Sequence, residues 1–394
     1  MPLLIWLLSA CCCASLASMR ACDTLLPALT QEFSVTIGQA ARTIFVFSVA
    51  YGICQLCFGP LGDRYGKLKV IACCALACVI GNAMAGLAPT LDWLVTARIV
   101  SGGCAAGIFP LAMAWIGDNV SYQERQVALA RLISGGVTGM LAGQWISGLV
   151  AQWIGWRMVF ALMAIVFLIV GALLLRAALH HGSEPPTAAK GMQAMLDVLR
   201  LPRARWILSL VTIEGAFAYG ALAFMPNLLQ THHAASLSTA GGIAAFYAVG
   251  GFVYSRSAAR LLQRIGESGL VCLGGATLCL GLLFFAYVPS MIWTPLGCAL
   301  AGFGFYAVHN TLQTNATQMA PQARGVAMSI FACFLFLGQS VGIMAAAWVA
   351  DHLTDTLIFA VDGVGLLMLA LVVRWYLQRP VPGTKPVPEA GPRR

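Results

Sequence analysis

Long apolar runs separated by short polar gaps are the dominant pattern along this chain. A transmembrane helix needs about 20 mostly apolar residues. Runs of that kind cover residues 3–28, 39–59, 69–88, 92–116, 128–150, 157–177, 205–228, 239–259, 268–288, 291–314, 325–349 and 356–378. A membrane β-barrel would instead show alternating segments of roughly ten residues. The pattern therefore predicts an all-α membrane protein with twelve transmembrane helices.

The composition excludes a water-soluble protein of this length. Hydrophobic residues make up 60% of the 394 residues and charged residues 9%, whereas about 25% are charged in an ordinary soluble domain. The net charge of +9 does not indicate nucleic acid, because the basic residues fall in the short gaps, where membrane topology accounts for them. The lipid bilayer is an expected partner and nucleic acid is not.

Lysine and arginine gather in alternate gaps. The basic residues that mark these gaps include Arg64, Lys67, Arg125, Arg260 and Arg324. The intervening gaps are nearly free of basic residues, so the positive-inside rule places both termini in the cytoplasm. The first apolar run lacks the basic start of a signal peptide and is expected to remain as a helix. The expected location is a bacterial inner membrane.

Sequence motifs recur at a shift of about 200 residues. Leu61-x-x-Arg64-x-Gly66 returns as Leu261-x-x-Arg264-x-Gly266, and Gly139 is matched by Gly338. A common offset predicts two parallel repeats, an arrangement that secondary transporters use. The expected domains are residues 1–177 and 205–378, each a bundle of six helices. A cytoplasmic linker at 178–204 and a cytoplasmic tail at 379–394 complete the predicted organisation.

Residues 59–69, which read Gly-Pro-Leu-Gly-Asp-Arg-Tyr-Gly-Lys-Leu-Lys, stand between the second and third predicted helices. This stretch resembles the signature of the major facilitator superfamily at the same position. Arg98-x-x-x-Gly102-Gly103 in the fourth helix is similar to a second motif of that family. The resemblance covers essentially the whole chain and implies two pseudo-symmetric bundles around a central site.

Residues 23–29, Asp-Thr-Leu-Leu-Pro-Ala-Leu, narrow the match. They resemble the first helix of the twelve-helix drug/proton antiporters, including bicyclomycin- and chloramphenicol-type exporters. Two features differ from that group. The fifth helix carries Gly139-x-x-x-Gly143-Gln144 without the usual proline, and Arg20, one turn before Asp23, lies outside the pattern.

Ionisable residues inside the membrane point to function, because each costs about 2.5–3.5 kcal/mol at the centre of a helix. Arg20, Asp23, Arg98 and Glu214 are the candidates for proton coupling. Asp23 and Arg98 fall at similar depths, so we expect that they can form an ion pair. Arg20 lies close to the same helix face as Asp23. This group either exchanges a proton or statically clamps the first helix to the fourth.

Glu214 lies about nine residues into the seventh helix, and its neighbours in the sequence include no base. We expect a proton carrier there, with a hydrogen-bonded packing role as the alternative. In the family, helices one, four, seven and ten line the cavity, which implies a contact between Glu214 and His309. The candidate cavity residues are Tyr219, Phe224, Phe305, Tyr306, His309 and Asn310. Aromatic walls with few charges suit an amphipathic or aromatic substrate.

The resemblance also implies a conformational latch around Asp63. The latch would dock against the eleventh helix and stabilise the outward-facing state, and Gly59 and Gly66 would allow close backbone approach. Its expected members are Gly59, Asp63, Arg64, Gly66, Lys67, Asp118 and Arg125. A plain topology-setting loop is the alternative.

The sequence therefore predicts a monomeric secondary transporter that exports a small organic or amphipathic compound in exchange for protons, by rocker-switch alternating access. There is no nucleotide-binding motif, the six histidines form no convincing metal set, and no cofactor is expected. A proton-coupled importer or facilitator of a sugar or organic acid is the alternative, which Arg20 and Arg98 favour if they bind a carboxylate. An enzyme or a sensor would need a nucleophile and a base at one depth, and a purely structural protein would not carry these charges.

Overall fold

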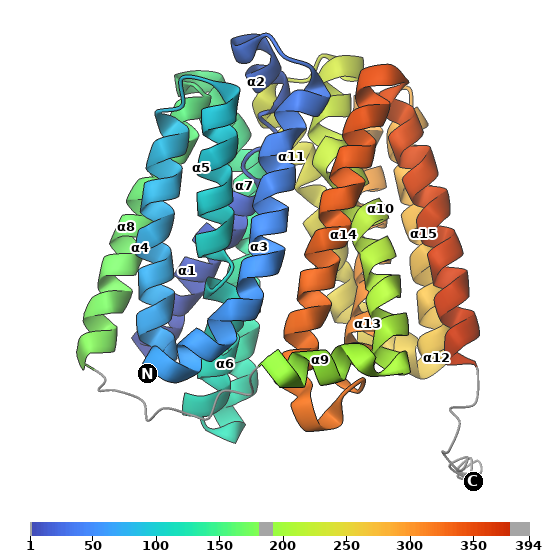
Figure 1. Cartoon of the computed structure of the whole chain (residues 1–394). Helices are drawn as coiled ribbons and strands as arrows, with labels where there is room; N and C mark the ends of the chain where they lie inside the picture. The colour runs from blue at the N-terminus through green and yellow to red at the C-terminus, as the bar shows by residue number, and fades with distance from the viewer. Residues whose placement is uncertain (1, 181–191, 379–394) are drawn as a thin grey trace.

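A computed structural model describes residues 2–180 and 192–378, and these residues form helices and short connections (Figure 1). The N-terminal helices are α1 (Pro2–Arg20), α2 (Leu26–Phe33), α3 (Ile37–Tyr65), α4 (Lys67–Gly86), α5 (Leu91–Ala105), α6 (Ile108–Asn119), α7 (Tyr122–Ile154) and α8 (Trp156–His180). After α9 (Met192–Arg200), the C-terminal helices are α10 (Pro202–His233), α11 (Leu237–Ala244), α12 (Phe246–Tyr287), α13 (Thr294–Thr317), α14 (Arg324–His352) and α15 (Asp355–Leu377). Two short 3-10 helices, Met291–Trp293 and Pro321–Ala323, precede α13 and α14.

The predicted all-α membrane fold is confirmed. Ten helical runs in the described residues are long and apolar enough to cross a membrane. One of these runs, Leu237–Tyr287, has 51 residues, more than twice the length that a bilayer needs. Its backbone leaves helical geometry at Gly266, where φ is 66° and ψ is 178°, so the chain crosses twice. Together with the 33-residue α7, this gives the twelve predicted crossings.

Three of the predicted helices are interrupted. The first, expected over 3–28, ends at Arg20 and resumes at Leu26. Pro27 lies in the first turn of α2, where its missing N–H costs nothing. The fourth crossing breaks between α5 and α6, and the eighth breaks between α11 and α12. Hydropathy hides the second and third breaks, because their residues, 106–107 and 245, are alanine and glycine.

Glycines bring helix backbones together in the same way in both groups of helices. Gly139 of α7 faces the backbone of Cys13 in α1. Gly338 of α14 faces Thr212 of α10 in the same manner. Both members of the second contact lie 199 residues after those of the first. The repeated motifs therefore correspond to repeated packing, as pseudo-symmetry requires.

The two groups of helices meet mainly near the upper end of Figure 1. There, α3 packs against α14, and α7 packs against α11. Asp351 of α14 accepts hydrogen bonds from the Thr36 hydroxyl (2.7 Å) and the Gly38 N–H (2.9 Å) at the start of α3. Gln152 of α7 accepts from the Ser238 hydroxyl of α11 at 2.7 Å. These contacts close the upper end.

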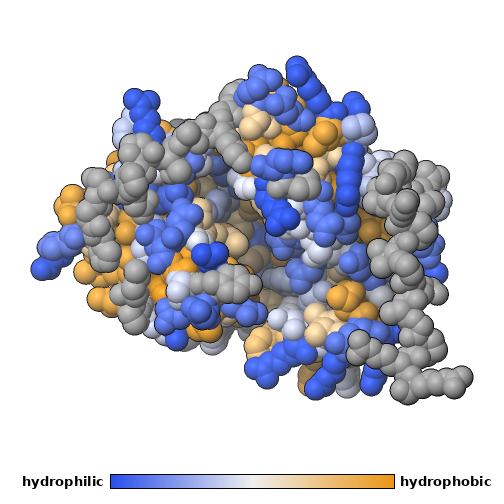
Figure 2. Space-filling view, turned by 90° about the horizontal axis from the view of Figure 1, so that it is seen from below, coloured by the Kyte–Doolittle hydropathy of each residue, from blue (hydrophilic) through white to orange (hydrophobic). Residues whose placement is uncertain are grey.

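The lower end is open between the two groups. Figure 2, which views this end, shows a recess at the centre of the face. The N-terminal end of α1 and the last described turn of α15 lie at this end, and α9 lies across it (Figure 1). Part of the predicted linker at 178–204 and the predicted tail at 379–394 fall outside the described residues. The proposed domain limits therefore stay a prediction.

We expect Gly139→Val to lower the free energy of unfolding by about 1–3 kcal/mol, because the new side chain must enter the contact with the α1 backbone. Gly117→Val is the control, since a Cβ there would meet no atom within 4 Å. Thermal unfolding in detergent micelles measures both. Equal losses in the two variants would show that close approach of α7 to α1 does not matter.

Candidate functional site

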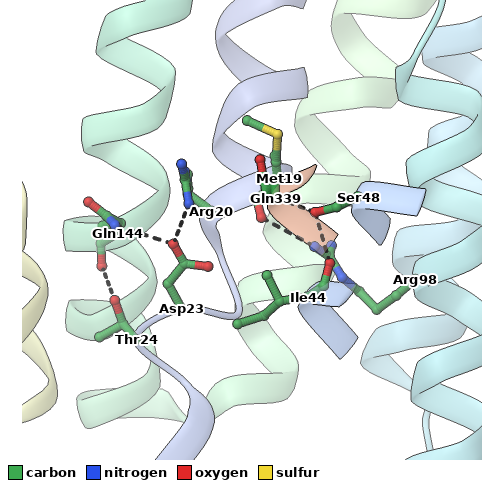
Figure 3. Close-up of polar contacts among 9 residues, drawn as sticks. All are labelled: Met19, Arg20, Asp23, Thr24, Ile44, Ser48, Arg98, Gln144 and Gln339. Atoms are coloured by element: carbon green, nitrogen blue, oxygen red, sulfur yellow. Dashed lines mark hydrogen bonds and ion pairs between the residues drawn. The ribbon is translucent and has the colours of Figure 1, made fainter. Parts of the chain in front are cut away.

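Asp23 lies in the break between α1 and α2 and is fully buried. Its Oδ2 accepts from Arg20 Nη1 at 3.1 Å and from Gln144 Nε2 at 3.3 Å, as Figure 3 shows. Thr24 fixes this arrangement by donating to the Gln144 carbonyl at 2.9 Å. Asp23 Oδ1 has no hydrogen-bond partner among the described residues. The carboxyl group therefore has one oxygen engaged and one free.

Arg98 does not form the ion pair with Asp23 that the sequence allows, since Asp23 pairs with Arg20 among the described residues. Arg98 is fully buried and donates to the carbonyls of Thr43 (3.4 Å) and Met19 (3.5 Å), apart from Asp23 (Figure 3). The end of α1 leaves its last carbonyls without intrahelical partners, and Arg98 occupies one of them.

Glu214 of α10 and His309 of α13 form the second buried polar pair. The His309 Nδ1 and Glu214 Oε2 atoms are 3.0 Å apart, and the Glu214 side chain has no exposed surface. Glu214 Oε1 has no partner within the described part of the chain. The contact expected between these residues is present. The neighbours of Glu214 in the sequence include no base, and His309 of another helix takes that place.

An aromatic cluster joins the two buried acids. The Arg20 guanidinium lies 4.8 Å from the centre of the Tyr219 ring. Tyr219 contacts Phe305 edge to face at 5.5 Å, and Phe305 stacks on His309 at 5.2 Å. Because Arg20 belongs to α1 and Tyr219 to α10, the connection crosses from one group of helices to the other. A series of packed side chains therefore connects the partner of Asp23 with the partner of Glu214.

The remaining cavity candidates divide into two kinds. Tyr306 packs against Phe305 at 5.4 Å and is partly exposed, as is Asn310 one turn further along α13. Phe224 is buried in the apolar core, and the structure gives it no ring contact with the cluster in the described residues. Tyr306 and Asn310 therefore fit a cavity wall better than Phe224 does.

Two residues of the site were missed from the sequence. Gln144 stood in the glycine-rich stretch of the fifth helix, but its amide was not linked to Asp23. A polar side chain among closely packed glycines is the signal that marks it. Tyr247 packs against Phe305 with the ring centres 5.8 Å apart and the rings tilted by 42°. An aromatic residue in an apolar run carries no comparable signal.

The expected latch residues surround Lys67, at the lower end of α4. Lys67 Nζ binds Asp63 Oδ1 at 2.9 Å and Asp118 Oδ2 at 3.0 Å. Gly66 has a φ of 91° and ends α3, so a residue with a Cβ would be strained there. Arg64 packs on the Tyr65 ring, and Arg125 donates to the Val120 carbonyl.

Two latch expectations remain predictions. A Cβ at Gly59 or at Gly66 would meet no atom within 4 Å, so neither residue has a close backbone neighbour in the described conformation. The docking of Asp63 against α14 is not formed in the described residues, since Asp63 binds Lys67. The lower ends of the two groups are apart, which separates Asp63 from that helix. An outward-facing state would have to form the contact.

A multi-helix bundle with paired charges at its centre and a recess at one end defines a membrane transporter. The chain belongs to the Major Facilitator Superfamily, whose family model matches residues 8–342.

Relatives of the chain include a drug resistance protein and an efflux pump. The chain is 25% identical to a chloramphenicol resistance protein of Streptomyces lividans, over 91% of each chain. It is 26% identical to the multi-drug resistance efflux pump PmrA of Streptococcus pneumoniae, over 79% of each. Among solved structures, the POT family transporter PepTSo matches with a TM-score of 0.77 at 14% identity, over 96% of this chain and 98% of that one. This last likeness establishes the shared fold.

We expect His309→Ala to lower the free energy of unfolding by about 1–3 kcal/mol, because it leaves Glu214 buried without a partner. Glu214→Gln keeps a hydrogen bond to His309 and should cost less than about 1 kcal/mol. A separate cycle of His309→Ala, Glu214→Ala and the double variant, measured by unfolding by heat in detergent, gives the coupling energy between the two residues, because both single changes remove the contact. A coupling energy of zero would show that the pair contributes nothing.

Proposed function

We propose that this transporter exports a small organic or amphipathic compound in exchange for protons. It acts as a monomer in a bacterial inner membrane, with both termini in the cytoplasm. The observation that carries the proposal is the pair of buried carboxyl groups, Asp23 and Glu214, on opposite sides of one aromatic cluster. The exporters among its relatives support the direction of transport.

Each acid has one oxygen free to accept a proton. Asp23 Oδ1 and Glu214 Oε1 are both without a partner among the described residues. A proton on the free oxygen removes the charge of the carboxylate and so weakens the bonds of the other oxygen to Arg20, Gln144 or His309. Because an uncompensated charge is costly in a medium of low dielectric constant, substrate binding nearby can shift the balance between the charged and the neutral acid.

Alternating access follows from the contacts between the two groups of helices. The upper end is closed by the contacts of Asp351 and Gln152, and the recess opens at the lower end (Figure 2). Since Lys and Arg concentrate at the lower end, we place that end in the cytoplasm. The described conformation is then inward-facing, which is the state that would load a compound for export.

A proton-coupled importer of an organic acid is the second candidate. The observation that favours it is Arg20, a buried cation beside Asp23 with unused hydrogen-bond donors. Flux under an imposed pH gradient separates the two candidates, because exchange and cotransport respond to the gradient with opposite signs.

We expect Asp23→Asn and Glu214→Gln each to lose pH-driven transport in proteoliposomes while retaining substrate-for-substrate exchange, because neither amide can carry a proton. The measurement uses a panel of compounds with and without a pH gradient. Asp92→Asn is the control, since Asp92 is 80% exposed and pairs with Arg42 at the surface, where such pairs contribute little. Full gradient-driven transport in both acid variants would contradict the proton assignment.

Asp63→Asn tests the proposed latch. We expect transport to slow about tenfold, which corresponds to about 1.4 kcal/mol, because the outward-facing state loses an acidic contact to α14. Lys67 keeps Asp118 as a partner, so the unfolding temperature should change little. Asp197→Asn, on the exposed face of α9, is the control. An unchanged transport rate in Asp63→Asn would contradict the latch and would favour the alternative, in which residues 59–69 only set the topology.

A further inference from the structure

Arg20 is buried with part of its hydrogen-bonding capacity unused. Its side chain is 1% exposed, and Asp23 accepts from Nη1 only. Nε and Nη2 have no hydrogen-bond partner among residues 2–180 and 192–378. A guanidinium presents five N–H donors in a rigid plane, and unpaired buried donors are costly. A ligand that brings an acceptor to this position therefore gains affinity.

The side chains around Arg20 indicate which chemical groups the rest of that ligand would carry. Tyr219 lies against the guanidinium, and Phe305 and Tyr247 extend the aromatic surface away from it. Tyr306 and His309 continue the cluster and are partly exposed. The cluster thus reaches from partly exposed side chains to Arg20. A compound with a flat aromatic body and one acceptor at its end matches this shape.

The proposed exchange with protons determines whether the acceptor group of the ligand is charged or neutral. An anion at Arg20 would favour the neutral form of Asp23, so that the anion and the proton would bind together. Cooperative binding of that kind suits cotransport and opposes exchange. Asp362, the other buried acid nearby, packs behind α10 against Gly220 and does not face Arg20 through any described contact. In an exchanger, the group that Arg20 binds is therefore uncharged.

We propose that Arg20 recognises the substrate by donating hydrogen bonds from Nε and Nη2 to a neutral oxygen acceptor, a carbonyl or nitro group, on an aromatic compound. This inference rests on the proposed exchange of substrate for protons. Ionised Asp23 orients Arg20 through a charge-assisted hydrogen bond. When Asp23 takes a proton, that bond becomes weaker, Arg20 loses its orientation, and the substrate is released.

The test compares two probes of similar size, 2-naphthamide and 2-methylnaphthalene, of which only the first has an acceptor. Equilibrium binding is measured on the full-length protein in nanodiscs, with empty nanodiscs as the blank. We expect the native protein to bind the amide at least about tenfold more tightly, and the preference to shrink as the pH falls. Arg20→Lys keeps the charge but not the planar donors and should abolish the preference. Arg42→Lys, at a surface ion pair, should keep it.

Equal binding of the two probes by the native protein, or a preference that survives Arg20→Lys, would overturn the proposal. The comparison on the native protein decides even if Arg20→Lys does not fold. Tighter binding of 2-naphthoate than of the amide, strengthening as the pH falls, would also overturn it and would support cotransport of an anion. A preference for the amide without pH-driven flux of the amide would support recognition by Arg20 and contradict the exchange of substrate for protons.

Discussion

The hydrogen-bonded ion pair between Arg20 and Asp23 is the interaction on which the rest of this structure depends. A charge in the membrane interior is tolerated only with partners, and this pair finds them where α1 is interrupted. The interruption leaves carbonyl groups without intrahelical partners, and Arg98 binds that of Met19. It also brings Asp23 within reach of Gln144 on α7. The carboxyl group thereby links α1 to α7. The break in α1 is therefore part of the site.

Pseudo-symmetry relates the helices of the site but not its two acids. Repeated glycine contacts place α1 and α10 in equivalent positions, yet the shift of 199 residues relates Asp23 to Leu222 and Glu214 to Ser15. The partners also differ, since Asp23 has arginine and glutamine, whereas Glu214 has histidine. Their connection through Tyr219 and Phe305 links a change at one acid to the other group of helices.

The sequence predicted the fold, the repeats and two of the buried acids, Asp23 and Glu214, because hydropathy, motif spacing and charge placement constrain them directly. It also placed His309 beside Glu214 through the family resemblance. It did not single out Asp362, which is also buried. It did not predict that Asp23 would choose Arg20 over Arg98, since that choice depends on the break after Arg20. Nor did it identify Gln144 or Tyr247, whose roles arise only when α7 and α12 pack against their neighbours. Contacts between residues of different membrane helices leave little trace in the sequence around each residue.

Proton exchange at Asp23 and Glu214 is the central claim, and infrared difference spectroscopy of the carboxyl C=O stretch tests it most directly. The native protein, stepped through a range of pH, should show a protonated-carboxyl band that weakens as the pH rises. Part of that band should disappear in Asp23→Asn and a separate part in Glu214→Gln. A native protein without such a band, or a band unchanged in both variants, would contradict the account.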